Sequence, residues 1–360
     1  MKGYRYKRIV NISARSRLRK IPLKDLSFFC RQMAAMIQAG VPATRAIEIC
    51  GQAADERLRQ ALGELNRRIR EGCTLSEAMG TMGNVFPELM VRVTEAGEQS
   101  GRLPQLFEKL AKGFASQYQL RKKVQGIMTY PAILFAVTAA SAIFLFTAVV
   151  PQFAAMLPEE NLPGITRAML AVSAFLTLHP ALCVFGLAGC LLFVRAMFEI
   201  PALRLQGSRL LLHLPAVGPA LRLSNGARFA SAFSILYGSG VGALESMETA
   251  GLLISNSYAR KRMDFAVQAV KEGSSFSEVF AMESLFPPAF AAMVAAGEES
   301  GQLARLLEEA GEFYEAQEGS AMEQLAALLE PGMILFMGLV VGTIVLSVVI
   351  PLYSMYSGMI

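Results

Sequence analysis

The octapeptide Ala96-Gly97-Glu98-Gln99-Ser100-Gly101-Arg102-Leu103 returns two hundred residues later as Ala296-Gly297-Glu298-Glu299-Ser300-Gly301-Gln302-Leu303. Other matches at the same shift extend the repeat in both directions: Gly40-Val41 with Gly240-Val241, Phe86-Pro87 with Phe286-Pro287, Tyr130-Pro131 with Glu330-Pro331, and Pro151 with Pro351. An internal repeat of this extent indicates one structural unit written twice. Each unit is a polar part that leads directly into an apolar segment.

The apolar content of the chain predicts membrane-spanning helices. The chain has 360 residues, of which 53% are hydrophobic, and a mean hydropathy of +0.41. Residues 124–158, 168–194 and 331–360 carry no charge, and each stretch exceeds the ~20 residues that an α-helix needs to cross a bilayer. Core helices of a soluble protein are the alternative, but helices of this length would normally show a polar face. We expect three transmembrane helices, at 130–153, 168–194 and 330–353.

Flanking charges predict that both polar parts lie in the cytosol. A basic run at 121–123 precedes the first span and three arginines follow the second (Arg195, Arg204 and Arg209), whereas the loop 154–167 has only Arg167. Lys and Arg collect on the cytosolic side of membrane proteins. The basic arm 1–24 lacks the apolar segment of a signal peptide, so we expect a cytosolic N-terminus. The number of crossings then places the tail 354–360 outside.

Local patterns predict helices in both polar parts, residues 25–129 and 225–329, which a connector at 195–224 separates from the second span. Apolar residues recur at helical spacing in 28–37 and 103–114, and no alternating strand pattern competes. Gly40-Val41-Pro42 marks a break before helices at 43–53 and 55–70, and Phe86-Pro87 opens a helix that should stop near Gly97. Thr74 and Ser275 each begin a capping box. We therefore expect an all-α membrane protein with two homologous six-helix cytosolic bundles.

The two polar parts differ in charge. Through Tyr130 the chain carries 23 Lys and Arg against 11 Asp and Glu, whereas residues 196–330 carry 9 against 16. The basic part could bind anionic lipid, an acidic protein face or the acidic part of a neighbouring chain, and the cytosolic bias of Lys and Arg explains some of the excess. Nucleic acid is not expected, because no set of aromatic residues is interleaved with the basic ones.

The sequence offers no recognisable catalytic or cofactor site. Phosphate-loop, zinc-protease and nucleophile-elbow motifs are absent, and the five cysteines form no CxxC pair, so we expect them to be small buried apolar residues. His179 and Cys183, four residues apart, could together bind a metal, but a structural role for that histidine is the preferred interpretation. The spans carry no other ionisable group, which argues against a transporter or an intramembrane protease. We expect neither an enzyme nor a cofactor.

Two groups of residues are candidates for contacts. The carboxylates of Glu98, Glu298 and Glu299 could bind a hard cation, but contact with a partner protein is the preferred interpretation. Candidate partner contacts are Gly97, Glu98, Ser100, Gly101, Gly297, Glu298, Glu299, Ser300, Gly301, Arg121, Lys122 and Lys123. Candidates for packing of the spans are Tyr130, Pro131, Glu330, Pro331, Gly338, Gly342 and Pro351. We expect Pro131 and Pro331 to lie at helix starts, where the missing N–H of proline costs little.

These motifs together resemble the inner-membrane platform proteins of type II secretion and type IV pilus assembly. The similarity covers nearly the whole chain and is carried by the doubled AGExSGxL turn, by Lys123 to Pro131 closing at Pro151, and by Glu330-Pro331 with the later glycines. It implies a multi-pass, non-catalytic protein beneath a growing filament. Its partners would be a hexameric secretion ATPase, pilins or pseudopilins, other inner-membrane assembly proteins and further copies of itself.

Two other functions stay open at this point. A membrane adaptor that binds anionic lipid or a signalling partner would explain the basic first part and the missing chemistry. An enzyme or transporter is the third possibility, and the apolar spans weigh against it. The short basic arm and the brief loop 154–167 leave open whether the system serves secretion, pilus formation or DNA uptake.

Overall fold

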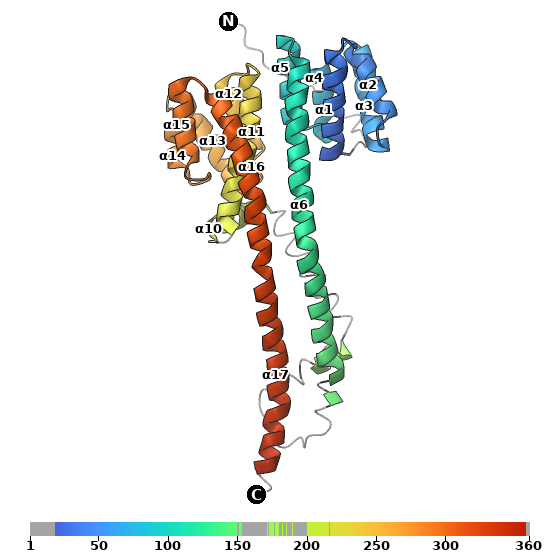
Figure 1. The fold of residues 1–360 in the computed structure, drawn as a ribbon, viewed down its shortest axis with the longest axis vertical. Helices are drawn as coiled ribbons and strands as arrows, with labels where there is room; N and C mark the ends of the chain where they lie inside the picture. Colours follow the sequence, from blue (N-terminus) through green and yellow to red (C-terminus); the bar gives the residue numbers. More distant parts are fainter. Residues whose placement is uncertain are drawn as a thin grey trace.

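The computed structural model describes residues 19–149, 151–152, 200–215 and 217–357, with ten further positions between 171 and 189. Within these residues every regular element is helical and no strand occurs. Figure 1 shows two groups of short helices at one end of the molecule and two long helices that run from them to the other end. The all-α class predicted from the sequence is confirmed for this part of the chain.

The first group, here called copy 1, consists of α1 to α6. Its elements are α1 (Leu23–Gln38), α2 (Ala43–Gln52), α3 (Glu56–Arg70), α4 (Leu75–Thr81), the 3-10 turn η1 (Gly83–Val85), α5 (Glu88–Ser100) and α6 (Leu103–Phe144), which continues into the π-helical turn η2 (Leu145–Val149). The helices expected at 43–53 and 55–70 are confirmed as α2 and α3. The expected end near Gly97 is wrong, because α5 runs on through this glycine to Ser100.

The second group, copy 2, consists of α11 to α17 and follows the short helix α10 (Pro201–His213). Its elements are α11 (Val217–Gly238), α12 (Ala243–Leu252), α13 (Ser257–Lys271), α14 (Phe276–Met282), α15 (Phe290–Ser300), α16 (Leu303–Ala327) and α17 (Leu329–Ser357). Both expected capping boxes are confirmed: Thr74 accepts the N–H of Glu77 and Ser275 accepts the N–H of Glu278, each at 3.2 Å. The order of elements therefore repeats from α1–α6 to α11–α16.

Each copy has its own apolar core. In copy 1, α1 packs on α6, and the buried rings of Phe29 and Phe107 meet edge to face with centroids 6.2 Å apart. In copy 2, α11 packs on α16 beneath a group of aromatic rings that includes Phe286 and Phe290, stacked at 4.6 Å. Aromatic pairs in such geometries add about 0.5–1.5 kcal/mol beyond the area that they bury. The long helix of each copy is thus anchored in its core at one end.

The far ends of the long helices are apolar and uncovered. Leu103–Val149 and Leu303–Thr343 are long and apolar enough to cross a membrane, and only 6% and 11% of their most apolar windows are buried. A core helix of a soluble protein would bury these windows, yet Phe135 is 63% and Leu335 is 75% exposed. The predicted second span at 168–194 and the loop 154–167 lie outside the described residues, apart from isolated positions, so three spans remain a prediction.

The long helices also join the copies to each other. Helix α6 packs beside α16 and α17, and α5 packs against α11 and α12. Because α6 and α16–α17 leave their groups in the same direction (Figure 1), both groups lie at the same end of the pair.

Candidate functional site at the seam between the copies

A series of polar contacts joins α6 to α16 and α17, and we call this series the seam. Its members on α6 recur every seven residues, which returns a helix to the same face after two turns. The pairs are Lys109 with Glu308 at 2.9 Å, Ser116 with Glu315, Lys123 with Glu323 at 2.9 Å, and Tyr130 with Glu330 at 3.5 Å. The partners lie 199 or 200 positions apart in the sequence. The seam thus brings corresponding parts of the repeat together.

The seam is basic or neutral on copy 1 and acidic on copy 2. The side chains of Lys109 and Glu308 are 38% and 47% exposed, and those of Lys123 and Glu323 are 48% and 51% exposed. Exposed pairs of this kind contribute about 0.2–1 kcal/mol each. Their main effect is therefore to set which faces of the two helices meet. Some of the positive charge of copy 1 is thus paired with negative charge of copy 2 in the same chain.

Two carboxyl groups of α16 are shielded from water: the seam member Glu315 is half-buried, and Glu318 beside the seam is buried. Glu318 is 5% exposed, and Glu315 accepts hydrogen bonds from Ser116 of copy 1 and from Ser231 of α11, the latter at 3.3 Å. Loss of hydration raises the pKa of both carboxyls above the ordinary value, although Arg228 and the nearby hydroxyls oppose this. The seam therefore contains acids that hold protons more tightly than surface acids do.

The repeated AGExSGxL motif forms the corner between α5 and α6 and again between α15 and α16. Gly101 and Gly301 end their helices with φ of +70° and +67°, a conformation that glycine adopts without strain. A Cβ at Gly97 would lie 2.8 Å from Leu103, and a Cβ at Gly297 would lie 2.9 Å from the Leu303 Cα. Ser100 and Ser300 each donate a hydroxyl hydrogen bond to the carbonyl four residues earlier, at 2.7 and 2.6 Å. The motif is thus explained by the folding of a tight corner.

The motif's glutamates fasten this corner to a neighbouring helix. The Glu98 carboxylate accepts the N–H groups of Leu75 and Ser76 at 2.7 and 3.1 Å, and the Ser76 hydroxyl at 2.5 Å. The Glu298 carboxylate accepts the corresponding N–H groups at the start of α14, both at 2.8 Å. A carboxylate here satisfies N–H groups that have no partner within the helix. Their contact with a partner protein stays a prediction, and the structure gives them an internal role that the sequence did not indicate.

The other predicted contact residues point to different parts of the surface. Glu299, Ser100 and Ser300 are exposed at the two corners. In the basic run, Arg121 and Lys122 are exposed, whereas Lys123 belongs to the seam. The exposed candidate residues therefore belong to three places: the two corners and the basic run.

The residues predicted to pack the spans lie in contrasting environments. Tyr130 and Glu330 meet at the seam, but the expected helix start at Pro131 is wrong: Pro131 is buried inside the continuous helix α6, whereas Pro331 lies in the first turn of α17. A proline inside a helix loses one backbone hydrogen bond, a cost that packing can offset. A Cβ at Gly338 or Gly342 would meet no atom within 4 Å, so their predicted packing partner is not among the described residues. Pro151 is half-buried just beyond η2.

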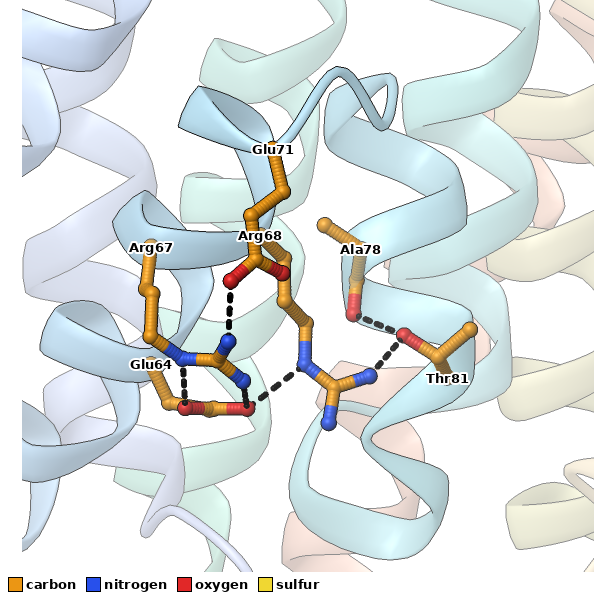
Figure 2. A network of polar contacts seen from close by, with 6 residues as sticks. All are labelled: Glu64, Arg67, Arg68, Glu71, Ala78 and Thr81. Carbon is orange, nitrogen blue, oxygen red and sulfur yellow. Dashed lines mark hydrogen bonds and ion pairs between the residues drawn. The ribbon is translucent and has the colours of Figure 1, made fainter. Parts of the chain in front are cut away.

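A further polar cluster that the sequence analysis missed holds α3 to α4 (Figure 2). The Glu64 carboxylate accepts hydrogen bonds from Arg67 and Arg68, both at 2.7 Å, and Arg68 reaches Thr81. These hydrogen bonds lower the pKa of Glu64 to about 2. The spacing of three and four residues between Glu64 and the two arginines is a helical ion-pair signal that could have revealed the cluster.

Two of the three described cysteines are buried as predicted, whereas Cys73 is half-buried. Cys30 and Cys50 are buried free thiols, and burial raises the pKa of Cys50 to about 11 and that of Cys30 further. His179 is exposed and lies edge-on to Phe175, with ring centroids 5.8 Å apart. Its suggested partner Cys183 lies outside the described residues, so the metal pair stays untested.

Comparison with known proteins agrees with the doubled architecture. A family model described as "Type II secretion system (T2SS), protein F" matches residues 29–151 and matches again at residues 229–351. Type IV pilus assembly protein PilC of Thermus thermophilus is 34% identical over 92% of this chain and 82% of its own length. Type II secretion system protein F of Vibrio cholerae is 31% identical over 94% and 84%, and type IV pilus assembly protein PilC of Pseudomonas aeruginosa is 27% identical over 94% and 91%. Since the two matches fall on copies 1 and 2, the chain belongs to the type II secretion system protein F family, whose relatives take their names from secretion and from pilus assembly.

Proposed function

We propose that this chain is a multi-pass protein of the inner membrane and forms the platform on which a type IV pilus or a type II secretion pseudopilus is assembled. The observation that carries the proposal is the continuity of α6, which runs for 42 residues from the copy 1 core into an exposed apolar segment. A continuous helix can pass a displacement of its soluble end to its membrane end. The seam ties this helix to its counterpart, so that both copies would move as one body.

The proposed topology has three spans, with two homologous six-helix bundles in the cytosol. The parallel course of α6 and α16–α17 supports it, because parallel helices that cross the same membrane keep both copies on one side (Figure 1). After Val149 the chain has fifty residues in which to return to Ile200, beside copy 2, and one crossing needs ~20. The N-terminus would lie in the cytosol and the C-terminus outside.

The proposed work of the platform is mechanical. A hexameric secretion ATPase would act on the cytosolic copies, and the spans would guide pilins or pseudopilins from the membrane into the filament. Exposed groups near the corners and the membrane, such as Glu299, Ser300, Arg121 and Lys122, are available for these partners and for other inner-membrane assembly proteins. The proposed role requires no catalytic step and no cofactor, and we propose that the chain works as a homo-oligomer.

Deletion of the gene tests the proposal. The pilins should still accumulate in the membrane while surface filaments or secreted substrate disappear, and expression of the wild-type chain should restore them. Continued filament assembly without the chain would refute the platform role. Salt-sensitive binding of the purified chain to anionic vesicles, combined with normal filaments in the deletion strain, would favour the membrane adaptor instead.

A further inference from the structure

We propose that this chain associates head to tail, so that the outer face of α15 and α16 in one molecule docks on the outer face of α1 and α2 in a second molecule. The docking face consists of Ala292, Ala296, Glu299 and Phe313. The receiving face consists of Phe28, Ala35, Ala39 and Arg45. The inference rests on the homo-oligomer part of the proposed function and names its interface.

The contact between the two copies within one chain is the template. There α5 and α6 of copy 1 pack against α11 and α12 of copy 2. The Ile235 side chain lies over Gly113, where a Cβ would be 3.9 Å from its terminal carbon. Arg92 pairs with Glu245 at 3.2 Å. One face of copy 1 thus meets a different face of copy 2.

The copies are therefore not related by an exact two-fold axis. Such an axis would repeat the Arg92–Glu245 contact as a contact between position 292 on α15 and Arg45 on α2, yet α15 and α2 lie on opposite sides of the molecule (Figure 1). The side of copy 2 that corresponds to the α5–α6 face, and the side of copy 1 that corresponds to the α11–α12 face, remain on the outside. Accordingly, α15 packs on α14 and α16 of its own copy, and α1 and α2 pack within copy 1.

Exposure supports this assignment position by position. Ile235 and Ser239 are buried at 8% and 5%, whereas their counterparts Ala35 and Ala39 are exposed. Phe28 on the same side of α1 is 40% exposed. The receiving face is therefore the uncovered equivalent of a surface that copy 2 buries.

The large and the small side chain change sides between the contact within one chain and the proposed contact between two chains. Within the chain, large Ile235 of α11 fits over small Gly113 of α6. In the proposed contact, the equivalent positions are Ala35 on the receiving face and Phe313 on the docking face. Phe313 is 53% exposed and is therefore available for a contact. A large residue again meets a small one, with the large residue now on the other side.

The basic and the acidic residue also change sides between the contact within one chain and the proposed contact. Within the chain the base, Arg92, is on the α5 side and the acid, Glu245, is on the α12 side. At the proposed contact, the α12-like position carries Arg45, and the α15 side carries exposed Glu299 in place of Gln99. Gln99 and Glu245 line one cavity between the copies, so their counterparts would be neighbours. Arg45 also contacts Glu48 of its own helix at 3.0 Å and is 61% exposed, which leaves it open to a second carboxylate.

The proposed contact is compatible with a membrane. The long helices of the two copies run in the same direction (Figure 1), so the rotation that relates the copies has its axis along these helices. Molecules that are related by a rotation about this direction keep every copy on the same side of the bilayer. A docking face and a receiving face on each chain then give a heterologous assembly that can close into a ring.

Photo-crosslinking of the full chain tests the proposal. Two differently tagged chains would be co-expressed in membranes, one with benzoylphenylalanine at position 313. We expect a covalent dimer in which the attached peptide lies within residues 28–45 of the other chain. The same probe at Phe265, a 59% exposed residue on α13, should give no dimer. The absence of a dimer, attachment to another region, or attachment to a different membrane protein would overturn the proposal.

Charge reversal gives an independent test on the same samples. Arg45→Glu or Glu299→Arg should each lower the yield of crosslinked dimer about fivefold, whereas the double variant should restore it. Lys261→Glu, a reversal at an exposed residue of α13, should leave the yield unchanged. A double variant as defective as the singles would contradict the pairing. No pilin or ATPase is needed in these membranes, so failure here leaves the platform role standing, and loss of that role leaves the crosslink unaffected.

Discussion

Removal of the Glu98 carboxylate should loosen α4 without unfolding copy 1. This carboxylate accepts two backbone N–H groups and the Ser76 hydroxyl at the start of α4, at distances between 2.5 and 3.1 Å. In Glu98→Ala those donors lose a charged acceptor and are left part-buried. The core of copy 1, built on α1 and α6, does not depend on them.

The size of the effect follows from these contacts. A hydrogen bond to a charged group contributes about 1.5–3 kcal/mol net, and water can replace part of each contact at this half-exposed site. We expect the free energy of opening α4 to fall by about 2 kcal/mol in total. Since each 1.4 kcal/mol is a factor of ten, the opening equilibrium should shift about thirtyfold. Glu98→Gln keeps one acceptor oxygen and should fall between the wild type and Glu98→Ala.

Hydrogen exchange of the full chain in lipid nanodiscs, followed by mass spectrometry, measures this opening directly. Amides of residues 75–82 should exchange about thirty times faster in Glu98→Ala, while amides of α1 and α6 keep their protection. Gln99→Ala, at the exposed neighbouring position, is the matched control and should exchange like the wild type. Unchanged exchange in α4 of Glu98→Ala would refute the capping role. Equal loss of protection throughout copy 1 would refute the local nature of the effect.

Three further outcomes are expected. Gly297→Ala should destabilise copy 2 by about 1–3 kcal/mol in thermal unfolding, because its Cβ would lie 2.9 Å from the backbone of α16, whereas Gly97→Ala meets a movable side-chain end at 2.8 Å and should cost less. Lys123→Glu should lower the unfolding midpoint slightly, by the equivalent of about 0.5 kcal/mol, and adding Glu323→Lys should restore it; a double variant worse than the single would contradict the seam. Burial raises the pKa of Glu318, so its contribution to stability is full below its ordinary pKa of 4.5 and is lost as the pH rises through the folded-state value. Glu318→Gln should therefore raise the unfolding midpoint at pH 7.5 and leave it unchanged at pH 4, and a lower midpoint at pH 7.5 would count against this account.

Local sequence signals predicted much of the fold. Thr74 and Ser275 begin helices as their capping boxes indicate, since the hydroxyl and the glutamate three residues later are adjacent in the chain. The repeat correctly indicated that α1–α6 would have counterparts in copy 2. Such features depend on residues a few positions apart.

Features that depend on distant residues could not be predicted in this way. The partners of Glu98 lie 22 and 23 residues earlier, on another helix, so the motif alone suggested a free surface group. Pro131 and Pro331 occupy matching positions, yet only Pro331 lies at a helix start. A proline's local preference does not reveal whether packing offsets the hydrogen bond that it loses. The seam was equally out of reach, because it requires the relative placement of the two copies.

Reconstitution tests the platform role most directly. Proteoliposomes would contain the pilins, with or without this chain, and the secretion ATPase would be added on the cytosolic side. The number and length of filaments would be counted by electron microscopy before and after addition of ATP. We predict ATP-dependent filament growth only from vesicles that contain this chain. Equal growth from vesicles that lack it would contradict its role as the assembly platform.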